Sequence, residues 1–212
     1  MIYIQKKHTP SYLTQEVQKN RGVMSAPQIY ESMDSGVKRK LYADILEEQH
    51  YLCAYCMSRI DFPENTAPSQ KITIDHYRSQ AHNPALSMSY GNMLGSCVRC
   101  QNSKGSEELS VNPLNKDDIS TVSYLSSGEI RSSRRDIEKD FELLELNSEF
   151  LRGARKAVRG AFIERLRSKY GSGRITVGEW NRIKRVLSDK EKYDPFIGIV
   201  IWFIEKQIRK VC

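Results

Sequence analysis

Two Cys-x-x-Cys pairs constrain the fold of this 212-residue chain more than any other feature of its sequence. Cys53 and Cys56 form the first pair in LCAYC, and Cys97 and Cys100 form the second in SCVRC. Each pair can chelate one ion through a tight turn, and the intervening chain is long enough to return to that ion. The spacing therefore predicts one structural Zn²⁺ held by four thiolates. The alternative, a thioredoxin-like redox motif, calls for a single pair in a βαβ setting.

The remaining composition indicates an ordinary globular protein, with 39% hydrophobic and 28% charged residues. The N-terminus lacks the apolar stretch of a signal peptide, and no apolar run approaches the roughly 18 residues that a membrane span needs. We therefore expect a cytoplasmic protein with no membrane contact. Routine disulfides are not expected in that compartment.

A polar motif lies between and just after the two cysteine pairs. The β-branched segment of residues 71–74 predicts a strand that ends in Asp75 and His76, and Asn92 follows in a turn-like stretch. Neighbouring residues on a strand point in opposite directions, so Asp75 can ligate a cation while His76 faces a water molecule. An isolated Asp-His pair is usually a surface or satisfied core pair. Here it ends a strand between two zinc knuckles, which makes it a candidate site.

Together these motifs resemble the HNH endonucleases that have a zinc-stapled ββα-metal core. Softer matches point to one subfamily, the PtuB-like nucleases of Septu and related retron antiphage systems, which work beside an ABC-type ATPase called PtuA. These matches are the opening residues 1–6 and the segments 112–114, 128–130, 144–147 and 193–196. The resemblance implies hydrolysis of nucleic acid, either DNA or RNA, with catalytic Mg²⁺ or Mn²⁺ and a PtuA-like ATPase partner.

The proposed chemistry assigns a role to each residue of the motif. His76 suits the general base because its pKa lies close to neutral pH, and Asp75 suits a Mg²⁺ ligand. By resemblance, Asn92 orients the histidine through backbone hydrogen bonds and Lys104 lies near the phosphate as an electrostatic clamp. The family's helix-borne metal ligand follows the last cysteine and is usually His or Asn.

In this chain that position holds Gln101, with Asn102 next along. A glutamine can present its carbonyl oxygen to Mg²⁺, although its longer side chain loses more conformational entropy when ordered. We expect an active site with Gln101 as the ligand. Two alternatives stay open: Asn102 substitutes after a small rotation of the helix, or the site is weakened. In the weakened case the protein is a non-catalytic zinc-finger module that binds nucleic acid or the ATPase.

Positive charge is concentrated in the second half of the chain. The net charge is +7, yet residues 1–130 are nearly neutral, while residues 152–185 hold 11 basic and 2 acidic side chains. Such density favours a polyanion partner through phosphate neutralisation. We expect the segment to bind nucleic acid beside the active site, with the candidates Arg152, Arg155, Lys156 and Arg159. The alternatives are a surface that docks the ATPase and an ordinary solvated helix face.

These patterns predict an α+β fold that is predominantly helical, with the zinc-stapled core embedded in it as one compact unit. Residues 1–50 form an N-terminal helical segment, 51–115 the nuclease core, and 116–212 a hairpin followed by a basic helical region. Within these parts the periodicity predicts strands in 57–75 and a hairpin that pairs 122–125 with 129–131. Helices are predicted at 35–49, 136–146, 148–169, 177–188 and 195–210.

Overall fold

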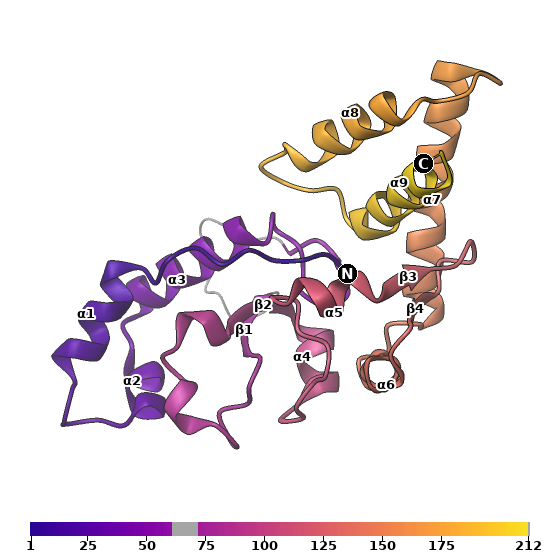
Figure 1. The fold of residues 1–212 in the computed structure, drawn as a ribbon. Coiled ribbons are helices and arrows are strands. Elements are labelled where there is room, and N and C mark those ends of the chain that lie inside the picture. Colours follow the sequence, from indigo (N-terminus) through magenta and orange to yellow (C-terminus); the bar gives the residue numbers. More distant parts are fainter. Residues whose placement is uncertain (61–71, 212) are drawn as a thin grey trace.

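The computed structural model describes residues 1–60 and 72–211 of the chain. The fold is α+β, and about half of the chain is helical. Figure 1 shows α1 and α2 at one end of the molecule and α7, α8 and α9 at the other, with β1, β2 and α4 between them. The predicted strands within 57–71 fall largely on residues outside the described ranges.

Three helices form the N-terminal part: α1 (Ser11–Lys19), α2 (Ala26–Ser32) and α3 (Ser35–Glu48). The side chain of Asp34 caps α3 by accepting hydrogen bonds from the backbone N–H groups of Gly36 and Val37. The helix predicted over residues 35–49 is therefore confirmed. The apolar faces of these helices form one core cluster with β1 and β2, composed chiefly of Leu13, Ile29, Leu41, Ile45, Ile74 and Met93.

The central part has two strands followed by a helix. The strands β1 (Ile72–His76) and β2 (Met93–Cys97) pair antiparallel, with His76 opposite Met93 and Asp75 opposite Leu94. The short 3-10 helices η1 (Pro84–Leu86) and η2 (Tyr90–Asn92) lie between them, and α4 (Val98–Lys104) follows directly after β2. This order places α4 next to the end of β1.

The C-terminal part contains the predicted hairpin and helices. After α5 (Lys116–Ser120), the strands β3 (Val122–Tyr124) and β4 (Ile130–Ser132) pair antiparallel, which confirms the hairpin. The hairpin turn needs a glycine at position 128 for two reasons. The backbone there has a φ of +85°, and a Cβ atom would lie 2.1 Å from the Arg152 carbonyl oxygen. The remaining elements are α6 (Arg135–Leu143), α7 (Glu149–Tyr170), α8 (Val177–Ser188) and α9 (Ile197–Val211).

A second core cluster joins this C-terminal part to the cysteine region. Its members come chiefly from the first cysteine turn, the hairpin, α6 and α9, and include Cys53, Tyr55, Val122, Phe141 and Ile199. Among the described residues, no helix combines the length and the apolar character that crossing a membrane would require.

Candidate metal centre and active site

The four predicted zinc ligands meet in one cluster. Cys53 and Cys56 lie in the turn before β1, Cys97 ends β2, and Cys100 lies in the first turn of α4. Their sulfur atoms all lie within 4.8 Å of one another, and the Cys56 and Cys97 sulfurs are 3.7 Å apart. Tetrahedral Zn–S bonds of about 2.3 Å place sulfurs about 3.8 Å apart. The cluster therefore has the geometry to hold one zinc ion.

The surroundings of the cluster suit thiolate ligands. The backbone N–H of Cys97 donates to the sulfur of Cys53 at 3.4 Å, and the N–H of Ser58 donates to the sulfur of Cys56 at 3.5 Å. Hydrogen bonding from Cys100 lowers the pKa of the Cys97 thiol to about 7. Arg99 donates to the Cys100 sulfur at 3.8 Å, so a positive charge lies beside the cysteine cluster. A dication that replaces the shared thiol protons would satisfy all four sulfurs.

The end of α3 fixes the first cysteine turn against β2. The side-chain amide of Gln49 donates to the Gly95 carbonyl, and its oxygen accepts from the Gly95 N–H at 2.7 Å. The backbone N–H of Ala54 also donates to the Gly95 carbonyl. A Cβ at Gly95 would lie 3.1 Å from the Gln49 amide nitrogen, so a glycine permits this close approach. The two cysteine pairs are thus held together by backbone contacts as well as by their sulfurs.

The predicted catalytic motif lies next to the cluster, along a cavity of about 400 Å³. Asp75 and His76 line it from β1, Gln101 and Lys104 line it from α4, and Tyr30 and Tyr42 line it from α2 and α3. Four predicted site residues are therefore brought together. Asn102 is exposed and does not line the cavity, so Gln101 is the better placed of the two helix candidates.

His76 is buried, with 6% of its surface exposed, and its ring is oriented by two contacts. Its Nε2 lies 2.9 Å from the carbonyl oxygen of Ser87, and the Tyr30 ring packs against it edge to face at 4.8 Å between centroids. A carbonyl can only accept, so Nε2 carries the proton and Nδ1 keeps its lone pair. Burial lowers the pKa of His76, although the Ser87 carbonyl and the Asp75 charge oppose this. The neutral, proton-accepting form is favoured.

Both carboxylate oxygens of Asp75 already have donors. Tyr55 donates its hydroxyl to Oδ2, and the Lys104 ammonium lies 3.2 Å from Oδ1. The same ammonium lies 3.0 Å from the His76 carbonyl oxygen. Burial raises the pKa of Asp75, against the Lys104 charge and the Tyr55 hydrogen bond.

Lys104, expected near the phosphate as an electrostatic clamp, has a charged partner within the protein. Lys104 lines the cavity but is only 1% exposed, and its ammonium is paired with Asp75. The helix α4 carries the side chain towards β1 because residue 104 is on the inner face of the last helical turn. In this structure Lys104 is the counter-ion of the proposed metal ligand.

Asn92 acts on the loop that follows β1. Its Oδ1 accepts from the backbone N–H of Arg78 at 2.7 Å, and its Nδ2 donates to the carbonyls of Arg78 and Leu86. These bonds close the loop that ends at Ser87, whose carbonyl holds the His76 ring. The structure therefore connects Asn92 to His76 through the backbone.

Sequence reasoning missed two residues of the site. Tyr55, in the middle of the first cysteine pair, is the hydroxyl donor to Asp75. Glu108 accepts from the backbone N–H of Ser79 and from the side chains of Arg78 and Asn83, so it also holds the loop. The position of Tyr55 between two metal ligands was a usable signal, whereas Glu108 carried none.

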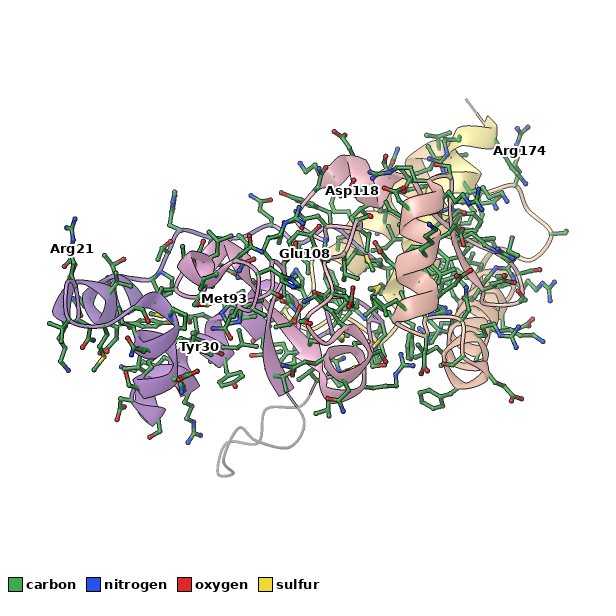
Figure 2. The ribbon with its side chains drawn as sticks, turned by 90° about the horizontal axis from the view of Figure 1, so that it is seen from below. Arg21, Tyr30, Met93, Glu108, Asp118 and Arg174 are labelled. Carbon is green, nitrogen blue, oxygen red and sulfur yellow. The ribbon has the colours of Figure 1, made fainter. Side chains whose placement is uncertain are left out.

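The basic segment differs from the prediction in one respect. Arg155 is 2% exposed and donates to the carbonyls of Gly128 and Leu146, so it is part of the core rather than a nucleic-acid contact. Arg152 and Lys156 are exposed, and Arg159 is partly exposed over the Phe203 ring. The expectation that this segment lies beside the active site stays a prediction. Figure 2 shows Arg174, just after α7, far from Tyr30 and Met93, whereas the four candidate residues lie in the first half of α7.

A comparison with known proteins agrees with the resemblance to PtuB-like proteins. Septu protein PtuB from Bacillus thuringiensis is 26% identical to this chain over 125 residues. The aligned part covers 58% of this chain and 44% of that protein, so the chain spans less than half the length of the curated relative. No family model matches the chain. The predicted resemblance to PtuB is confirmed by this match.

Proposed function

We propose that this chain, a relative of Septu protein PtuB, is a metal-dependent endonuclease of the HNH type that hydrolyses phosphodiester bonds in DNA or RNA. One observation carries the proposal. His76, whose Nδ1 has no hydrogen-bond partner among the described residues, lines the same cavity as Asp75 and Gln101, and the four-cysteine cluster holds together the strands and helix that bear them. A base and hard oxygen ligands in one cavity suit phosphodiester hydrolysis.

The chain's own residues divide the work of hydrolysis. His76 accepts a proton from the attacking water at Nδ1, while the Ser87 carbonyl accepts a hydrogen bond from Nε2 and stabilises the charged ring. Asn92 fixes the loop that carries Ser87. Asp75 and the Gln101 amide oxygen would hold Mg²⁺ or Mn²⁺, for which oxygen donors are the preferred ligands. A bound cation would supply charge stabilisation at the scissile phosphate.

By its relation to PtuB, we propose that the protein is the effector of a Septu-type antiphage defence system and works with a PtuA-like ABC-type ATPase. The exposed basic side chains of α7, chiefly Arg152 and Lys156, are proposed to hold nucleic acid or to dock the ATPase. Phosphate contacts from such a surface position a substrate without reading its sequence.

A second function is favoured by a specific observation. The Lys104 ammonium occupies Asp75 Oδ1, and glutamine stands where the family has His or Asn. Both features fit a non-catalytic zinc module that binds nucleic acid or the ATPase. Such a module would bind but never cleave.

The deciding experiment is a nuclease assay on DNA and RNA, with Mg²⁺ or Mn²⁺, in the presence and absence of the ATPase. His76→Ala should reduce cleavage by about 10²–10⁴-fold, because it removes the general base. The control is His8→Ala, which changes an exposed histidine in the segment before α1. Zinc content and thermal unfolding should be the same in both variants. Cleavage by His76→Ala at the wild-type rate, or no cleavage by the wild type with the ATPase present, would favour the non-catalytic module.

A further inference from the structure

The strongest unassigned feature of the molecule is the buried ion pair inside the cavity wall. Lys104 Nζ lies 3.2 Å from Asp75 Oδ1 and 3.0 Å from the His76 carbonyl oxygen, and both charged side chains are at most 5% exposed. A buried lysine and aspartate remain charged only because each compensates the other. Lys104 therefore already neutralises the Asp75 carboxylate to which a divalent cation would bind.

Two further contacts fix the carboxylate in this state. Tyr55 donates its hydroxyl to Oδ2, so the second oxygen is also engaged. Tyr55 lies between two cysteines, and Lys104 lies four positions after Cys100 on α4. Both partners of Asp75 are thus carried by segments that the cysteine cluster holds in place.

We infer that Lys104 is a built-in counter-cation that competes with the divalent ion for Asp75. This inference rests on the proposed function, because it concerns the same metal site. A divalent ion bound at Asp75 would lie within a few ångströms of the ammonium, and like charges at that separation repel strongly in a buried site. Loading the site therefore requires the Lys104 ammonium to leave Asp75. The adjoining cavity of about 400 Å³, which Lys104 lines, gives it space to do so.

The first consequence concerns the affinity for a divalent ion, which is measurable without any nuclease substrate. Mn²⁺ binding to zinc-loaded protein can be followed by electron paramagnetic resonance of the free ion. Lys104→Met keeps the side-chain volume and removes the charge, so it should tighten Mn²⁺ binding by about tenfold or more. Lys7→Met serves as the matched control, because Lys7 is an exposed lysine whose partner Glu47 is also exposed.

The Asp75→Asn change separates this inference from the proposed function. In the wild type and in Lys104→Met, it should abolish the tight Mn²⁺ site. If Asp75→Asn changes Mn²⁺ binding in neither background, or if no variant binds Mn²⁺, the proposed metal site falls. If Asp75→Asn weakens binding but Lys104→Met binds no more tightly than the wild type, only the counter-cation role is overturned.

A measurement on the wild type covers the case in which Lys104→Met fails to fold. Lysine acylation followed by mass spectrometry should leave Lys104 unlabelled without divalent ions, because it is buried. Saturating Mg²⁺ should make Lys104 reactive, whereas the exposed Lys7 should react equally in both conditions. Continued protection of Lys104 at a Mg²⁺ concentration that fills the Asp75-dependent site would overturn the inference.

Discussion

Replacing Arg155 by alanine tests whether this residue belongs to the core or to the basic surface. Its guanidinium donates to the Gly128 carbonyl at 2.6 Å through Nε, and to the Leu146 carbonyl and the Asn147 side-chain oxygen through one terminal nitrogen. These acceptors belong to the hairpin turn and to the segment between α6 and α7. Arg155 therefore connects α7 to the hairpin turn and to the segment between α6 and α7.

The magnitude follows from the groups that the substitution leaves without partners. Truncation leaves two buried backbone carbonyls unsatisfied, at about 1–3 kcal/mol each. The lost packing of the long aliphatic stem adds to this. We expect Arg155→Ala to lower the free energy of unfolding by about 3–5 kcal/mol, which is large among single substitutions. The neighbouring Lys156→Ala removes an exposed lysine of the same helix. It should change the free energy of unfolding by about 0.5 kcal/mol or less.

Urea denaturation followed by circular dichroism, with zinc present throughout, measures both effects. At an m-value of roughly 2 kcal/mol/M, Arg155→Ala should lower the midpoint by about 2 M, while Lys156→Ala should leave it unchanged. Equal midpoints for the two variants would refute the assignment of Arg155 to the core. Equal loss of nucleic-acid binding in two folded variants would restore its assignment to the basic surface.

Three further changes test the cysteine cluster, the helix ligand and the basic face. Cys53→Ser should lower zinc content, measured by elemental analysis, and destabilise the fold, because metal binding and folding are coupled. Gln101→Ala should weaken the Mg²⁺ dependence of cleavage more than Asn102→Ala, since Gln101 lines the cavity; the reverse order would make Asn102 the ligand. Reversing Arg152 and Lys156 to Glu should weaken nucleic-acid binding uniformly across sequences and flatten its salt dependence in filter-binding assays. If instead a pull-down of the ATPase fails while binding to nucleic acid persists, this face docks the partner.

The fold was most predictable where local patterns determine the structure. The helix predicted at 177–188 matches α8, because an apolar period is preceded by a capping box in which Thr176 and Glu179 exchange hydrogen bonds. The hairpin followed from two short β-branched segments around Ser126–Gly128. The short helices α1, α2 and α5 were not predicted individually. With few turns each, they depend more on packing against the rest of the chain than on their own period.

In the candidate site, too, only the features that depend on local sequence were predictable. The cysteine cluster was predictable because ligand spacing within each pair is a local property. The pairing of Lys104 with Asp75 was not, because it depends on how α4 crosses the end of β1, a contact between segments 29 positions apart. Arg155 was misassigned because charge density reports how many basic residues a helix carries but not which of them faces the core. One position along α7 separates the buried Arg155 from the exposed Lys156.

The cysteine cluster and the candidate active site are built from the same segments of the chain. Tyr55 reaches Asp75 from inside the first cysteine turn, and Lys104 reaches it from the helix that begins beside Cys97 and contains Cys100. The strand β2, which ends at Cys97, pairs with β1 and so sets the position of both Asp75 and His76. Loss of the metal would free the turn and the start of the helix together, and both donors to Asp75 would lose their fixed positions. A zinc ion held by these four cysteines would therefore set the geometry of the carboxylate as well as the stability of the fold.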